Sequence, residues 1–256
     1  MIDENLDMSP EEVLQMKEIK EWIKENHNLK VKASDDLNIL YFIRSAKNDC
    51  CRAKMKIEKF SKMRRDCKEW FSNRNPFLPE MQELFKIGVF LPIQSKPNEP
   101  FIVVIRTAAH DPSKHVFDNV LKCSKMILDL LMRLEPTISK TGVVAILDMK
   151  GVSFGHALQL TPNVIKKLVS SMESYPIKVK LLEFVHCPPH INFILNTFRL
   201  FMSQKMKSRL VVRVSSSEVE ADLPSNLGGK GSSYQEIASN WKKIVENNSS
   251  FYEGND

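Results

Sequence analysis

The spacing of hydrophobic residues changes near Pro76 and divides the chain into two parts. From Pro10 to about Ser72, apolar residues recur at intervals of three and four among helix-forming residues, which predicts several short helices. Ser9-Pro10-Glu11-Glu12 and Ser34-Asp35-Asp36 are typical helix starts. A third helix is expected from Cys51 to Ser72, and its basic face is interpreted as solvated.

After residue 76, short runs rich in β-branched residues alternate with longer helical patterns. This alternation predicts an α/β fold in which helices connect the strands of a mixed or parallel sheet. We therefore predict a helical N-terminal domain at 1–75 and an α/β domain at 76–256. The expected strands are 89–91, 101–106, 143–147, 181–185 and 210–214, and the expected helices are 117–134, 161–174, 191–206 and 234–245.

The segment Ile191 to Met202 is apolar on nearly all sides of a helix. Such a helix is either deeply buried or borders a second apolar phase. Six basic residues and one acid, Glu183, lie between Lys178 and Arg209, so positive charge surrounds this helix. An apolar helix beside cations is how peripheral proteins meet anionic lipid surfaces, so a membrane contact is an alternative to a core position.

Composition narrows the class of protein. The 256 residues are 43% hydrophobic, which supports a sizeable core, and 37 basic against 31 acidic residues give a net charge of +6. The five cysteines lack the even number of a disulfide framework, and the acidic N-terminus does not resemble a secretory signal. The apolar stretches are far shorter than the about 20 residues of a membrane-spanning helix. We expect a monomeric cytoplasmic protein that associates peripherally with membranes.

Two motifs in the sequence are candidates for catalysis or metal binding. Gly151-Val152-Ser153-Phe154-Gly155 matches the nucleophile elbow of serine hydrolases, but only Glu173 or Glu183 with His186 or His190 could complete the triad in order. His186-Cys187-Pro188-Pro189-His190 has too few ligands for a zinc site, and no phosphate-binding loop is present. We therefore expect no catalytic residues, metal, cofactor or nucleic-acid partner.

Several motifs, in order, resemble those of the CRAL-TRIO family of lipid-binding proteins, and within it the α-tocopherol transfer protein-like branch. The resemblance covers nearly the whole chain. It implies a helical N-terminal domain and a sheet that forms the floor of a closed apolar cavity, with a mobile gate helix as the lid. The motifs are Asp35-Asp36 with Phe42-Ile43-Arg44-Ser45-Ala46-Lys47, Asp148-Met149-Lys150-Gly151, Phe154-Gly155-His156-Ala157 with Thr161-Pro162, Tyr175-Pro176-Ile177-Lys178-Val179-Lys180, and Leu223-Pro224 with Leu227-Gly228-Gly229.

The resemblance also assigns residues to three sites. The lipid pocket is expected to be lined by Ser124, Leu128, Val143, Leu147, Phe154, Leu168, Met172, Tyr175, Ile177 and Leu182. The gate helix is expected to face the cavity or a membrane through Ile191, Ile194, Thr197, Phe198 and Phe201. A phosphoinositide headgroup, such as that of phosphatidylinositol bisphosphate, is expected at Lys178, Lys180, Lys205 and Arg209.

Some positions depart from the family pattern. Ala46 replaces the second signature arginine, His186-Cys187-Pro188 replaces the usual Asn-x-Pro before the gate, and Leu128 lies where the tocopherol branch has a polar residue. A bulky, mostly apolar ligand is expected, such as vitamin E, a retinoid, a carotenoid or a sterol-like lipid. The leading hypothesis is a carrier that transfers this lipid at phosphoinositide-containing membranes, and the alternative is a lipid-sensing adaptor that holds a protein partner.

Overall fold

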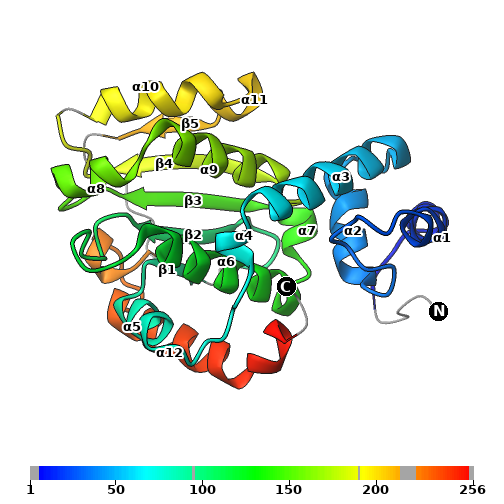
Figure 1. Cartoon of the computed structure of the whole chain (residues 1–256), viewed down its shortest axis with the longest axis horizontal. Helices are drawn as coiled ribbons and strands as arrows, with labels where there is room; N and C mark the ends of the chain where they lie inside the picture. The colour runs from blue at the N-terminus through cyan, green and yellow to red at the C-terminus, as the bar shows by residue number, and fades with distance from the viewer. Residues whose placement is uncertain (1–5, 94–95, 190, 214–222, 254–256) are drawn as a thin grey trace.

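A five-stranded sheet forms the centre of the molecule, with helices on both faces and a group of helices at one end (Figure 1). The structure is a computed structural model that describes residues 6–93, 96–189, 191–213 and 223–253. The predicted α/β fold is confirmed. The strands are β1 (Phe90–Ile93), β2 (Phe101–Arg106), β3 (Val143–Asp148), β4 (Val179–Val185) and β5 (Leu210–Val212).

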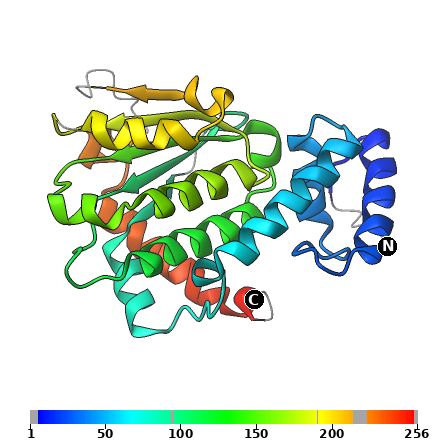
Figure 2. The ribbon, with the colours of Figure 1, turned by 45° about the horizontal axis from the view of Figure 1, so that its top comes forward.

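The strands lie in the sheet in the same order as in the sequence. β1 pairs antiparallel with β2, and every later pair is parallel. Because right-handed crossovers that all step in one direction place their helices on one face, the connecting helices share a side of the sheet. Figure 2 shows this layer, which consists of α6 (Phe117–Leu134), α9 (Pro162–Ser174) and α10 (Ile191–Phe201).

The C-terminal segment covers the other face. The 3-10 helix η1 (Ser225–Leu227) and α12 (Tyr234–Asn247) pack on inward-facing residues of the first strands and β4. Tyr234 donates a hydrogen bond to Asp148 Oδ2 over 3.0 Å, which ties α12 to the end of β3. α5 (Pro79–Ile87) packs beside α12 and was not predicted, although Pro79 at its first turn and Gly88 at its end are typical boundaries.

The N-terminal helices are α1 (Pro10–Glu25), α2 (Asp36–Ser45), α3 (Cys50–Asp66) and α4 (Lys68–Phe71). The predicted caps at Ser9 and Asp35 are confirmed, since their side chains accept hydrogen bonds from backbone N–H groups. The prediction of a single third helix from Cys51 to Ser72 was wrong. The helix ends at Cys67, and the separate helix α4 buries Trp70 against α6. Trp70 Nε1 donates to Asp118 Oδ1 over 2.8 Å there.

Two further boundaries differ from the predictions. The helix expected at 191–206 divides into α10 and α11 (Gln204–Lys207), because Ser203 caps a new helix by accepting from the N–H of Met206. The described part of the last strand ends at Val212, and its predicted end, Val214, lies outside the described residues. The short helices α7 (Ile138–Thr141), α8 (Phe154–Gln159) and η2 (Ser249–Tyr252) complete the fold.

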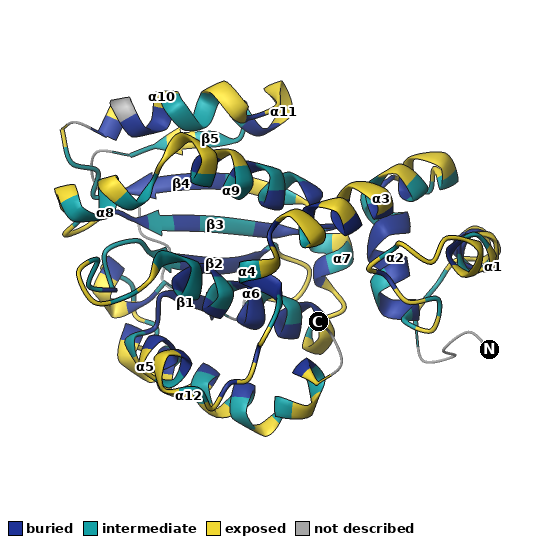
Figure 3. Ribbon diagram, viewed as in Figure 1, coloured by how far each residue is buried: buried dark blue, intermediate teal, exposed yellow. Residues whose placement is uncertain are grey.

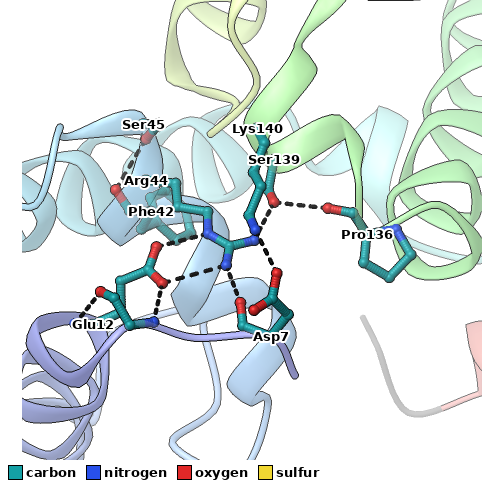
Figure 4. Close-up of polar contacts among 9 residues, drawn as sticks. Asp7, Glu12, Phe42, Arg44, Ser45, Pro136, Ser139 and Lys140 are labelled. Carbon is teal, nitrogen blue, oxygen red and sulfur yellow. Dashed lines mark hydrogen bonds and ion pairs between the residues drawn. The ribbon is translucent and has the colours of Figure 1, made fainter. Parts of the chain in front are cut away.

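Arg44 joins the helical group to the α/β part of the chain (Figure 4). Its guanidinium donates to Glu12 Oε1 on α1 over 2.7 Å and to Ser139 Oγ on α7 over 2.7 Å. Tyr41 adds a hydrogen bond to the carbonyl of Glu135, just after α6, over 3.0 Å. Ala46 occupies the position of the second signature arginine and is fully buried at the end of α2. Arg44 therefore makes this junction without a second arginine.

The core is continuous across this junction, because buried residues of the N-terminal helices and of α6 belong to one hydrophobic cluster. The exposed residues of α1 and α3 lie on their outer sides (Figure 3). The predicted division after residue 75 falls between α4 and α5 and stays a prediction.

Candidate functional site

An apolar cavity of about 260 Å³ lies between the sheet and the helices on its α6 face. Val143, Ala145 and Leu147 line it from β3, because alternate residues of a strand face the same side. Leu168 and Met172 line it from α9, where a spacing of four places them on one helix face. The volume is close to the lower end of the range of about 300–1,000 Å³ typical of ligand pockets.

The structure brings nine of the ten predicted pocket residues together around this cavity. Phe154 is the exception, because it lies at the first turn of α8 with 76% of its surface exposed. The prediction that Phe154 lines the pocket is therefore wrong for this arrangement. Whether the other residues contact a ligand stays a prediction. The nine are Ser124, Leu128, Val143, Leu147, Leu168, Met172, Tyr175, Ile177 and Leu182.

α10 covers one side of the cavity. Ile194 and Phe198 line it, four residues apart on one helix face. Ile191 is buried in the adjacent hydrophobic cluster rather than in the cavity wall. Thr197 is half-buried and Phe201 is 36% exposed, so these two predicted gate residues lie outside the lining.

A second hollow, of about 350 Å³, lies between the N-terminal helices and the start of β4. Lys178, Lys205 and Arg209 line it, as the resemblance implies. Lys180 lies outside the lining but close to Lys178, and its positive charge is the main reason that the pKa of Lys178 is lowered. We call this hollow the basic cleft.

Sequence reasoning missed the contribution of the N-terminal helices to the basic cleft. Lys56 on α3 is close enough to Lys205 that their charges interact, although burial is the larger cause of its lowered pKa. Lys56 and Lys205 are far apart in the chain, so no local sequence pattern could predict that they lie close together. The other cations that the N-terminal helices and α7 add to the lining are Arg44, Lys47, Lys59 and Lys140.

Two acids line the basic cleft, and both already have partners. Glu12 binds Arg44, as described above. Glu173 accepts from the N–H of Ser203 over 2.8 Å and lies 3.7 Å from Lys59 Nζ. Most of the cations in the lining therefore have no carboxylate partner within it, and such a site attracts anions.

The basic face predicted for the third helix is only partly solvated. The Arg64 side chain is mostly buried, and its guanidinium lies 3.2 Å from Asp129 on α6. Lys54 and Lys62 pair with Glu18 and Asp66 at the surface. The prediction of a wholly solvated face was therefore wrong at Arg64.

Among the residues that the structure describes, Ser153 does not meet the acid and histidine that a hydrolase triad requires, and the candidate His190 lies outside them. Its Oγ lies 2.7 Å from His156 Nδ1, which was not among the predicted triad histidines, and the two residues cap the start of α8. His156 Nε2 contacts the carbonyl of His110 rather than a carboxylate. Glu183 pairs with Arg213, and His186 Nδ1 lies 2.9 Å from Asp148 Oδ1, so neither serves Ser153.

Two other sequence expectations concern metals and membranes. Within the described ranges, no group of three or more His, Cys, Asp or Glu side chains is placed to hold a metal ion, and His190 lies outside those ranges. None of the helices described is both long and apolar enough to span a bilayer.

Two family models match successive parts of the chain. A family model described as the CRAL/TRIO domain matches residues 86–229, which include the sheet, the cavity and α10. A second model, described as a Pinta-like UBA domain, matches residues 9–81, which include the N-terminal helices.

Several known proteins are similar to this chain over three quarters or more of its length. The human alpha-tocopherol transfer protein-like protein is 26% identical over 80% of this chain and 59% of its own length, and the mouse protein is 26% identical over 75% and 56%. Mouse clavesin-2 is 21% identical over 82% of this chain and 63% of its own length. The chain thus spans less than two thirds of these relatives. The crystal structure of Sfh5 shares the fold, with a TM-score of 0.55 and 14% identity over 94% of this chain and 99% of that one.

Proposed function

Since the chain belongs to the CRAL/TRIO domain family, we propose that it binds one hydrophobic lipid in the cavity beneath α10 and transfers it at phosphoinositide-containing membranes. The observation that carries this proposal is the apolar cavity beside an anion-attracting cleft. Burial of the lipid would contribute about 25 cal/mol per Å² of apolar surface removed from water.

The position of α10 suggests how a membrane would open the cavity. One part of this helix lines the cavity through Ile194 and Phe198, whereas Leu200 is 79% exposed and stands shortly before Lys205 of the basic cleft. Anionic headgroups that bind the basic cleft would hold Leu200 near the acyl chains. α10 would then exchange its contacts with the cavity for contacts with lipid, and the ligand would leave without crossing water.

A first test measures whether a lipid is bound. Native mass spectrometry and organic extraction of protein from a lipid-rich host are expected to show one lipid, displaced by tocopherol, a retinoid or phosphatidylinositol. An empty protein that takes up none of these would contradict the carrier function.

A second test separates lipid binding from lipid delivery. The double variant Lys205→Gln, Arg209→Gln should slow transfer to phosphoinositide vesicles about 30-fold, since each lost cation removes about 1 kcal/mol of attraction to an anionic surface and the two together remove about 2 kcal/mol. Ligand affinity should be unchanged, because neither residue lines the cavity.

The control is Lys230→Gln with Lys243→Gln, which removes the same charge from exposed positions on the C-terminal segment. Equal losses of transfer in both double variants would contradict a specific role for the basic cleft. Lipid binding by the wild type without any transfer would favour the adaptor hypothesis.

A further inference from the structure

One lysine lies in the wall of the apolar cavity. Lys125 on α6 lines the cavity and is only 8% exposed. Other polar side chains of the wall have partners of their own: Ser124 donates to the carbonyl of Val120, and Thr107 donates to the carbonyl of Asp148. Arg106 donates to the carbonyl of Ile87.

The amine of Lys125 has no such partner. Its Nζ lies 4.8 Å from the centroid of the Tyr175 ring, which is a cation–π contact. Across the described part of the chain, it makes no hydrogen bond or ion pair with any side chain or carbonyl. Burial lowers the pKa of this amine to about 8, and the nearby charge of Asp129 only partly offsets that effect.

The carboxylate of Asp129 is already occupied. It accepts from Arg74 over 2.6 Å, from Arg64 over 3.2 Å and from the hydroxyl of Tyr175 over 2.7 Å. Asp129 therefore already binds three other groups. Among the described residues, the amine of Lys125 lacks a negative charge in hydrogen-bond contact, and an uncompensated buried cation is costly.

The acids on neighbouring segments do not supply that charge. Glu69 on α4 pairs with Lys167 over 2.6 Å. Asp118, at the start of α6, accepts from Trp70 Nε1. Lys125 lines the cavity, so a ligand bound there would lie beside its side chain.

We propose that the ligand of this cavity is an anionic amphiphile, an apolar chain or ring system that carries one carboxylate, and that this carboxylate pairs with Lys125. The inference rests on the proposed lipid binding and names the chemical class of the ligand. A single amine is a point charge suited to one monoanionic group, whereas phosphate sites commonly use arginine forks or several backbone N–H groups. Neutral lipids of the same shape leave the amine without a counter-charge.

The test compares lipids that differ only in their polar end. Delipidated protein is titrated with oleic acid, oleyl alcohol and methyl oleate, and with retinoic acid and retinol. The acids should bind the wild type about 10- to 100-fold more tightly than the matched neutral lipids, the gain typical of a charge-assisted hydrogen bond. Lys125→Leu should abolish this preference and leave the affinity for the neutral lipids the same or higher.

Lys122→Leu is the matched control, because Lys122 is on the same helix but does not line the cavity. It should keep the preference for acids. Lys125→Met provides a second variant if Lys125→Leu folds poorly. Nuclear magnetic resonance of the lysine amines gives an independent measurement, in which bound acid raises the pKa of Lys125 and bound alcohol does not.

The outcomes distinguish this inference from the proposed function. Equal affinity for acids and neutral lipids, or an acid preference that survives in Lys125→Leu, overturns the carboxylate proposal while lipid binding stands. Failure of the wild type to bind any of these lipids overturns both.

Discussion

At the scale of single residues, Lys125 couples the cavity to the stability of the fold. Its pKa, lowered to about 8 by burial, lies well below that of a lysine in the unfolded chain. Between pH 8 and about 10.4 the unfolded state holds a proton that the folded state has released, so unfolding becomes less favourable as the pH rises. Cys67 has a pKa raised to about 11 by burial, so its thiol stays neutral over this range.

We therefore predict that the free energies of unfolding of ligand-free Lys125→Leu and of the wild type differ by an amount that depends on pH. At about 1.4 kcal/mol per pKa unit, the variant should be about 3 kcal/mol more stable below pH 8, less the cost of any imperfect packing of leucine. Most of this advantage should disappear by pH 10. Urea denaturation across this range measures it, and a constant gap would show that Lys125 does not change its charge there.

Gly142 is a second residue whose role follows from its immediate surroundings. Its φ is +78°, and a Cβ atom there would lie 2.3 Å from the carbonyl oxygen of Lys178. Gly142→Ala should lower the free energy of unfolding by more than about 2 kcal/mol, because backbone strain and a steric clash add.

Gly151→Ala is the control for this prediction. Its φ of +83° imposes similar strain, but the nearest atom to the added Cβ, the Cβ of Ala108, is 3.7 Å away. Gly151→Ala should therefore lower the free energy of unfolding by less, about 1–2 kcal/mol. Denaturant unfolding measures both variants, and equal losses would show that the contact with Lys178 relaxes freely.

At the scale of elements, β3 and α10 form opposite walls of the cavity. Ala145 on β3 is small and faces the space that Ile194 and Phe198 close from α10. Ala145→Phe should fill part of the cavity and weaken lipid binding more than tenfold, about 1.4 kcal/mol. Ala145→Ser, which adds almost no volume, should bind normally. Fluorescence titration measures both affinities, and tight binding by Ala145→Phe would place the ligand elsewhere.

The elements also show how far the sequence predicts this site. The family resemblance predicted Val143 and Leu147 as lining residues, and both line the cavity because alternate residues of a strand face the same side. The break at Cys67 was missed because no proline or glycine marks it, and the burial of Trp70 against α6 is what produces it. Lys125 was missed because a lone lysine in an amphipathic helix is usually solvated, and its burial depends on Tyr175 and the neighbouring helices.

At the scale of the whole molecule, the basic cleft contains residues from both segments that match a family model. Lys56 comes from the segment similar to a UBA domain, and Lys205 comes from the CRAL/TRIO domain. Lys56 is held there by a hydrogen bond of 3.2 Å to Ser45 Oγ. Anion binding in this cleft would therefore draw on both domains, which a single-domain alignment does not show.

Lys56→Met should consequently weaken binding to phosphoinositide vesicles about fivefold, or about 1 kcal/mol for one cation near an anionic surface. Lys62→Met is the control, because Lys62 is an exposed residue of the same helix that pairs with Asp66. Vesicle sedimentation gives both affinities. If the two variants lose binding equally, the effect comes from total charge rather than from the cleft.

The order of strands across the sheet has a consequence for how the protein is made. Because each strand pairs with the one before it in the sequence, every strand after the first finds its neighbour already synthesised when it leaves the ribosome. β2, β3 and β4 with α6 and α9 precede α10, so the floor and walls of the cavity are synthesised before its cover. A lipid present during translation therefore meets an open apolar surface, whereas a lipid offered to the finished protein must first displace α10.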